Sequence, residues 1–332
     1  MKSKYLGIVI AAVFAIGLVS YFSWSGNSTL DNSSLNDSTL GTSTFEEPAF
    51  QEPDFEEPSF QEPTLEYSTF DNAELYIPFS MSDPKVLEIT SPDDVFRTFV
   101  HEDDVFNVGD TLVPRHLYLR AKPDLGYLYD ELRVDYKQNT IVILPFFTSS
   151  AYATGGFYDY YRETCETCTT TDILWDVSSF EWTSSISGLQ ALKALGYKFV
   201  SDMDVDKHPD ILKNYDKVIV LHNEYVTRAE FDAITSHPKV MFLYPNALYA
   251  EITVDYDKNT ITLIRGHNYP PEDPANNGFD WFWENTHPYE YDHDCIDWEL
   301  YEIDFPNGVM LNCYPENKIA ADKNLLRAIK VY

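Results

Sequence analysis

Basic residues are scarce in this chain of 332 residues, which has 23 lysines and arginines against 54 aspartates and glutamates and a formal net charge of −31. Binding to nucleic acid requires basic patches that neutralise phosphates, and binding to anionic lipid surfaces requires patches of the same kind. The charge balance therefore excludes nucleic acid as a partner. It leaves cation binding open.

Lysine and arginine are absent between Lys4 and Lys85, and this stretch begins with an apolar run at residues 5–24. The run is long enough to span a bilayer, and Lys2 and Lys4 before it place the N-terminus in the cytoplasm. We predict a single-pass membrane anchor at residues 1–24, with the rest of the chain on the extracellular side. A cleaved signal peptide, which would give a secreted protein, remains the alternative, although no clear Ala-x-Ala site follows the run.

Residues 25–71 lack the apolar residues of a core and are rich in Ser, Thr, Asn, Pro and Glu. A five-residue repeat of Glu-Pro with a following Phe or Leu starts at Glu47, Glu52, Glu57 and Glu62. Three glycosylation sequons begin at Asn27, Asn32 and Asn36. This composition predicts a disordered stalk that can carry glycans and that separates the following domain from the membrane.

Cysteine is rare, with Cys165 and Cys168 in one Cys-Glu-Thr-Cys motif and Cys295 and Cys313 further on. An even number of cysteines in an oxidising compartment predicts disulfides, and three pairings are possible. A zinc site is the alternative, but it would need a second Cys-x-x-Cys motif. Cys295 and Cys313 flank a predicted strand at residues 298–303 and could close one loop, which leaves Cys165 and Cys168 as a short-range pair.

The remaining chain divides into a β-rich region at residues 72–139 and an α/β region at residues 140–332. Two similar segments, residues 131–144 and 251–264, are predicted to be β-hairpins that turn at polar residues around an asparagine. Strands are predicted at residues 141–147, 198–200, 218–221 and 240–243. A helix is predicted at residues 186–195, and Thr227-x-x-Glu230 is a capping box for a second helix. This alternation is typical of a parallel sheet covered on both faces.

The predicted strand at residues 218–221 is followed directly by His222, Asn223, Glu224 and Tyr225. In an open parallel sheet, ligands bind outside the carboxyl ends of the strands. The helix capped by Thr227 directs the positive end of its dipole toward the same edge. The sequence therefore places a candidate site at this strand end.

Three motifs follow one another along the chain: Leu221-His-Asn-Glu-Tyr-Val-Thr227, then Val240-Met-Phe-Leu-Tyr-Pro-Asn-Ala-Leu-Tyr249, and, after a strand pair, Arg265-Gly266. Together they resemble the C-terminal domain in the large chain of N,N-dimethylformamidase. The resemblance covers residues 196–266 and implies a flavodoxin-like sheet of the class I glutamine amidotransferase type. The chain departs from the family pattern in three places. Asn223 replaces an acid, Val226 replaces an aromatic residue, and Tyr244-Pro245 replaces a Gly-Gly pair.

Class I amidotransferases carry a cysteine nucleophile after the strand that corresponds to residues 240–243, and the turn here has no Cys, Ser or Thr. Thiol amidotransfer is therefore excluded. The resemblance implies instead a metal-dependent amidohydrolase in which two tyrosinates and a glutamate hold iron. It makes Tyr225 a metal ligand and makes His222 and Glu224 candidate catalytic residues. The second tyrosine is expected before residue 196, where Phe180 and Trp182 stand.

Other segments could supply further ligands. His287 and His293, in an acidic stretch, are candidate ligands for iron or another divalent metal, although a solvated acidic loop has the same composition. Gly155 and Gly156, with an aromatic cluster through residue 161, could present backbone amides to a ligand. Asn246, the asparagine of the second motif, is a further candidate for ligand binding. The acids of residues 202–206 lack the glycine and distal glutamate of a calcium-binding loop.

Two functions fit these observations. The first is a non-catalytic module on the cell surface that has the amidotransferase-like fold and binds a glycan or protein of the cell envelope. The second is a divergent metal-dependent hydrolase that acts on small amides. The missing nucleophile and the missing second tyrosine favour the non-catalytic module.

Overall fold

The computed structural model describes residues 80, 82–108, 111–280, 295–303 and 308–332, and its centre is a six-stranded sheet. In spatial order the strands are β14 (Leu300–Ile303), β15 (Gly308–Leu311), β11 (Val240–Phe242), β9 (Lys217–Val220), β6 (Thr140–Leu144) and β8 (Lys198–Ser201). All neighbours pair in parallel except β14, which is antiparallel to β15 at one edge. The protein is therefore a mixed α/β protein with a largely parallel sheet.

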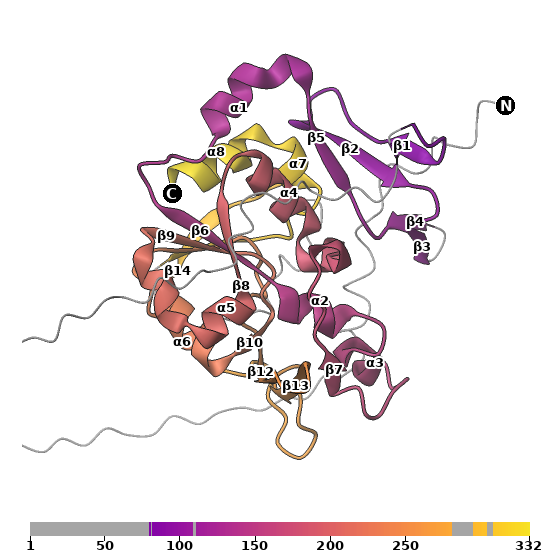
Figure 1. Ribbon diagram of the computed structural model, residues 1–332, viewed down its shortest axis with the longest axis vertical. Coiled ribbons are helices and arrows are strands. Elements are labelled where there is room, and N and C mark those ends of the chain that lie inside the picture. Colours follow the sequence, from indigo (N-terminus) through magenta and orange to yellow (C-terminus); the bar gives the residue numbers. More distant parts are fainter. Residues whose placement is uncertain (1–79, 81, 109–110, 281–294, 304–307) are drawn as a thin grey trace, which may run out of the picture.

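Helices cover both faces of this sheet (Figure 1). On β6, Val142 and Leu144 belong to one hydrophobic cluster and Ile141 and Ile143 to the other, because successive side chains of a strand point to opposite faces. One face is covered by α4 (Ile186–Ala194), α7 (Lys318–Ala321) and α8 (Lys323–Val331), and the other by α5 (Asp202–Lys207) and α6 (Arg228–Thr235). Burial on both faces explains why these strands are continuous apolar runs.

The order of the parallel strands identifies one special point on the sheet edge. Numbered along the chain from β6, the strands lie in the order 2-1-3-4-5, so the direction of chain progression reverses between β6 and β9. At such a switch point the connections leave opposite faces of the sheet, and a crevice forms at the carboxyl ends of the two strands. The chain leaves β6 into α2 (Phe146–Tyr152) and leaves β9 into the segment that contains His222 and Glu224.

A second, four-stranded sheet lies beside this edge. Its order is β10 (Tyr225–Thr227), β12 (Ala250–Asp255), β13 (Thr260–Arg265) and β7 (Thr170–Asp172). The antiparallel pairing of β12 with β13 confirms the hairpin predicted at residues 251–264. The prediction of a second hairpin at residues 131–144 is wrong, because α1 (Gly126–Leu132) occupies its first part and β6 pairs in parallel with β8 and β9. All five residues of β6 are buried, so long-range pairing outweighs the local turn signal.

Residues before α1 form a small β region that packs on the same core. A three-stranded sheet contains β1 (Val86–Glu88), β2 (Phe96–His101) and β5 (Tyr118–Ala121), and β3 (Val105–Val108) pairs with β4 (Thr111–Pro114). Phe96 and Leu119 belong to the hydrophobic cluster on the α4 face of the central sheet. Gln190 of α4 accepts from the Leu119 amide at 2.7 Å and donates to the Leu117 carbonyl at 2.6 Å, so side-chain hydrogen bonds fix β5 on α4.

Both predicted disulfides are present, Cys165–Cys168 and Cys295–Cys313, and all four cysteines are paired. The predicted anchor and stalk at residues 1–71 lie outside the described residues. Within the described part of the chain, no helix has both the length and the apolar character needed to cross a bilayer.

Candidate functional site

The predicted cluster lies at the switch point, directly after β9, and side chains from other segments hold its backbone. The His222 amide donates to Ser185 Oγ at 2.9 Å. The amides of Glu224 and Tyr225 both donate to Thr148 Oγ1 of α2, at 3.0 and 3.2 Å. Buried amides require acceptors, and these hydroxyls supply them where the strand ladder ends. The loop after β9 is therefore fixed by α2 and by the residue before α4.

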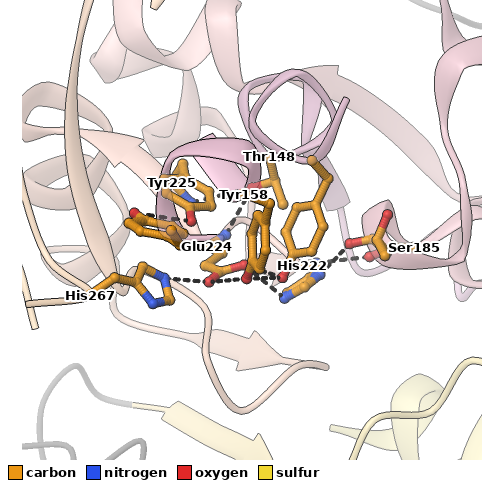
Figure 2. A network of polar contacts seen from close by, with 10 residues as sticks. Thr148, Tyr158, Ser185, His222, Glu224, Tyr225 and His267 are labelled. Carbon is orange, nitrogen blue, oxygen red and sulfur yellow. Dashed lines mark hydrogen bonds and ion pairs between the residues drawn. The ribbon is translucent and has the colours of Figure 1, made fainter. Parts of the chain in front are cut away.

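Glu224 is the centre of the polar network and is completely buried (Figure 2). Its Oε2 accepts from the Tyr152 hydroxyl at 2.8 Å, and its Oε1 accepts from His267 Nε2 at 2.6 Å. The Tyr158 hydroxyl lies 2.6 Å from the Tyr152 hydroxyl and 3.4 Å from Glu224 Oε1. One carboxylate and two phenols thus converge at one point. Tyr152, Tyr158 and His267 are each only partly buried as whole residues.

The two phenols come from neighbouring helices joined by a tight turn. Tyr152 ends α2, and Tyr158 lies in α3 (Phe157–Tyr161). A side chain on Gly156 would meet three backbone oxygens within 2.8 Å, so only glycine permits this approach of α3 to α2. The Gly155 amide donates to Asp159 Oδ2 at 2.7 Å and the Gly156 amide to the Ala153 carbonyl at 2.8 Å. The two glycines predicted to present amides to a ligand instead use them inside the turn that positions the tyrosines.

His267 reaches Glu224 from the end of β13. Gly266 has a φ of +123°, and a Cβ there would lie 2.8 Å from the Ala250 backbone, so glycine is required where β13 crosses close to β12. The next residue, His267, has a φ of 52°. Its ring packs against the rings of Tyr225 and Tyr249, with centroid distances of 5.6 and 4.5 Å. A left-handed backbone at a non-glycine residue is uncommon, and here it turns the imidazole onto the carboxylate.

Tyr225, the metal ligand implied by the resemblance, lies beside the carboxylate network. Its hydroxyl is 3.4 Å from the Tyr161 hydroxyl, and its ring packs edge-on against Phe157 with a centroid distance of 5.2 Å. The phenols that contact Glu224 are Tyr152 and Tyr158. Phe180, at the position where a second tyrosine was expected, is buried against Phe146 in the core.

His222 is 1% exposed and stacks on the Tyr244 ring with a centroid distance of 5.1 Å. Its Nδ1 contacts the Thr183 carbonyl oxygen, which only accepts hydrogen bonds, so Nδ1 carries the proton in the neutral ring. Its Nε2 is 3.4 Å from Glu224 Oε2. Burial lowers the pKa of His222 below its usual value, against the opposing effect of the Glu224 charge. Asn246, predicted to bind a ligand, lies beside this imidazole and is 8% exposed.

Burial controls the charges of this site. It raises the pKa of the Tyr152 and Tyr158 phenols well above the usual value for tyrosine, and the neighbouring Glu224 charge raises it further. Burial would also raise the pKa of Glu224, but His267 and His222 and the Tyr152 hydroxyl together hold it below its usual value. Without a cation, the site therefore contains neutral phenols that hydrogen-bond to an ionised carboxylate.

Within the described residues, no group of three or more His, Cys, Asp or Glu side chains is placed to hold a metal ion. The oxygen donors that meet here belong to Tyr152, Tyr158 and Glu224, and His267 Nε2 lies 2.6 Å from Glu224 Oε1. His287 and His293 lie outside the described residues. Asp202, in the acidic stretch at residues 202–206, accepts from the Phe147 amide at 2.7 Å and so fixes the start of α2.

Sequence reasoning located His222, Glu224 and Tyr225 at this edge, but it did not assign Tyr152, Tyr158 or His267 to the network. The aromatic cluster at residues 155–161 contains Tyr158, and its position after the strand at residues 141–147 was the signal that could have placed it at the same edge. His267 directly follows the Arg265-Gly266 end of the hairpin. No model of a known protein family matches the chain, and no curated protein does.

Proposed function

We propose that this chain is a metal-assisted hydrolase of small amides, built on a flavodoxin-like sheet of the class I glutamine amidotransferase type. The strand order 2-1-3-4-5 is that of flavodoxin-like folds, in which ligands bind at the switch point. The observation that carries the proposal is the convergence of the Tyr152, Tyr158 and Glu224 oxygens, 2.6 to 3.4 Å apart, at this point of the sheet.

The donor set fits the group that the resemblance implies. Two phenols and one carboxylate are hard oxygen donors, and hard cations prefer such ligands. This is the combination implied by the likeness to N,N-dimethylformamidase, with Tyr152 and Tyr158 rather than Tyr225 beside the glutamate. Because burial keeps both phenols protonated by raising their pKa, binding of iron or another cation would release their protons, and affinity would rise with pH.

His222 supplies the proton chemistry. A bound cation would polarise the carbonyl of an amide. The Thr183 carbonyl fixes the imidazole tautomer so that Nε2 presents a lone pair beside Glu224. Nε2 can therefore accept the proton of a water molecule that attacks the carbonyl carbon, and it can return this proton to the leaving nitrogen. Tyr244, stacked on the ring, holds the imidazole in this orientation.

We further propose that this activity faces the outside of the cell, on the predicted anchor at residues 5–24. Two disulfides are consistent with an oxidising compartment. The sequence favoured a non-catalytic module in part because the second tyrosine was missing. The positions of Tyr152 and Tyr158 beside Glu224 weaken this objection, because two phenols are available to the site.

Metal analysis of the purified full-length protein, combined with acetamide hydrolysis, tests the proposal. We expect one equivalent of metal per chain and, if the metal is ferric iron, a visible absorption band from the phenolates. The double variant Tyr152→Phe/Tyr158→Phe should lose the metal, the band and the activity together. Tyr160→Phe, on the same helix as Tyr158 but away from Glu224, is the matched control and should retain all three. A protein without stoichiometric metal that hydrolyses no amide would support the binding module instead.

A further inference from the structure

His267 contacts the buried carboxylate of the candidate site through a ring nitrogen. Its Nε2 donates to Glu224 Oε1 at 2.6 Å, and its side chain is 24% exposed, whereas that of Glu224 is completely buried. Figure 2 shows His267 and His222 on opposite sides of this carboxylate. The His267 imidazole therefore belongs to the same group of metal-binding atoms as the hydroxyls of Tyr152 and Tyr158.

The spacing of these atoms is close to that of ligands around one cation. Two donors that each lie about 2.1 Å from the same ion are about 3.0 to 3.4 Å apart at octahedral or tetrahedral angles. The Tyr152 and Tyr158 hydroxyls are 2.6 Å apart, and the Tyr158 hydroxyl is 3.4 Å from Glu224 Oε1. The same Oε1 atom is 2.6 Å from His267 Nε2. A cation that replaced the protons between these atoms would require only a small separation of the closer pairs.

The backbone and the neighbouring rings hold the imidazole in this position. His267 and Asn268 are two successive non-glycine residues in the left-handed region, with φ of 52° and 62°. The His267 amide donates to the Asn276 carbonyl at 2.9 Å, and the imidazole lies against the Tyr161 ring with a centroid distance of 5.1 Å. Such a backbone costs free energy and persists where the surrounding structure enforces it, which is common at functional sites. His267 Nε2 is therefore directed at Glu224 before any ligand binds.

We propose that His267 is a fourth ligand of the cation, through Nε2, beside Tyr152, Tyr158 and Glu224. The inference rests on the proposed function and goes beyond the ligands that the resemblance implies, which are all oxygen donors. On binding, Nε2 releases its proton to solvent and donates its lone pair to the cation. Imidazole nitrogen suits zinc, copper and iron, whereas Mg²⁺ and Ca²⁺ prefer oxygen ligands. The fourth ligand therefore selects a transition metal, and His222 remains available for proton transfer.

The affinities of the full-length protein for Zn²⁺ and Mg²⁺ test this selection. Asparagine tolerates a left-handed backbone, so His267→Asn should fold normally while its shorter side chain withdraws the nitrogen ligand. The variant should bind Zn²⁺ about 100-fold more weakly and should bind Mg²⁺ as the wild type does. His116→Asn is the matched control, because His116 Nδ1 lies 2.7 Å from Asp104 Oδ2 in another imidazole–carboxylate pair, away from the phenols. It should leave both affinities unchanged.

Pulsed electron paramagnetic resonance of the protein with one equivalent of Cu²⁺ tests the bond itself. The wild type should show coupling of the copper electron to an imidazole nitrogen. This coupling should disappear in His267→Asn and persist in His222→Asn, which removes the other imidazole beside Glu224. A histidine that only orients the carboxylate would give no such coupling in the wild type, so the experiment separates ligation from a structural role.

Acetamide hydrolysis by the metal-loaded protein reports separately on the proposed function. If the coupling depends on His267 but no amide is hydrolysed, the hydrolase function fails and the ligation stands. If amides are hydrolysed and the wild type shows no imidazole coupling, the function stands and the inference is overturned. Coupling that persists in His267→Asn, coupling that is lost in His222→Asn, or absence of cation binding also overturns the inference.

Discussion

Ionisable side chains are buried at both ends of the central sheet, but the two ends differ in whether these side chains have hydrogen-bond partners. At the amino end, Lys217 of β9 is 1% exposed and its Nζ donates to the Ile329 carbonyl in the last turn of α8 at 2.9 Å. Carbonyls in the last turn of a helix lack intrahelical donors, so this contact satisfies both groups. At the carboxyl end of the same strand, Glu224 gathers two phenols and His267, while His222 Nε2 and Asn246 Oδ1 have no donor among the described residues.

This difference separates a structural role from a functional one. A buried charge that only supports the fold should have a partner from the fold itself, as Lys217 has. A site that binds and converts a ligand must keep some of its polar atoms for that ligand, even though unpaired buried groups reduce stability. On the proposed function, the amino end therefore has a structural role, and the carboxyl end gives up some stability for chemistry.

Replacing the central carboxylate should have the largest effect. We expect Glu224→Gln to lose its bound metal and to hydrolyse acetamide about 10³-fold more slowly. The substitution removes the negatively charged metal ligand, and it removes the carboxylate that His267 and His222 face. Glu316→Gln is the control for metal content, since Glu316 is also buried but contacts Tyr244 and the Ser187 amide instead of the two phenols beside Glu224. Full metal occupancy in Glu224→Gln would break the proposed contrast between the two ends.

The two ends should also respond to pH with opposite signs. At the carboxyl end, Glu316 contacts Tyr244, which follows β11. Burial raises the pKa of Glu316 to about 7, so the folded protein should lose about 3 kcal/mol of unfolding free energy as pH rises from 4.5 to 7. Burial lowers the pKa of Lys217 to about 8, so the unfolding free energy should rise by a similar amount, about 3 kcal/mol, as pH rises from 8 to 10.5. The free energy of urea unfolding is measured for the wild type, Glu316→Gln and Lys217→Met across both pH ranges, and the difference between the wild type and each variant is followed with pH. Differences that are flat with pH would contradict this prediction.

Removing the hydroxyl that holds the loop after β9 should have an intermediate effect. Thr148→Val leaves the amides of Glu224 and Tyr225 without their acceptor and should lower the unfolding free energy by about 2 kcal/mol. Metal affinity should fall with it, because Glu224 is no longer fixed. Thr235→Val removes a hydroxyl that donates within α6, at 2.7 Å to the Phe231 carbonyl, and should change metal affinity very little. Equal metal loss in both variants would show that the loop is not held by Thr148.

The smallest effect is expected at the amino end. Lys217→Met at pH 7 should change the unfolding free energy by about 1 kcal/mol or less, because the loss of the bond to Ile329 is offset by removing a buried ammonium group. Metal content and amide hydrolysis should remain at wild-type levels. Loss of metal in this variant would show that the two ends of β9 are coupled and that the contrast between them is too simple.

The sequence located the cluster correctly along the chain because the signals were local. An apolar run at residues 218–221, followed by ionisable residues and a capping threonine, identifies a strand end before a helix, and α6 begins after Thr227 as expected. The disulfide pairs also followed from short sequence distances. The hairpin at residues 131–144 was predicted wrongly because its turn residues resemble those of residues 251–264, while its last strand belongs in the middle of the parallel sheet.

By itself, the sequence determined the chemistry available to this protein: an acidic chain, paired cysteines, and a His-Asn-Glu-Tyr segment at a strand end. Only the tertiary structure decided which side chains meet. Tyr152 and Tyr158 are more than sixty positions away from Glu224, and His267 is forty-three positions beyond it. They meet because the strand order reverses between β6 and β9 and because Gly156 and Gly266 allow close backbone crossings. These contacts depend on long-range packing, which local sequence patterns do not encode.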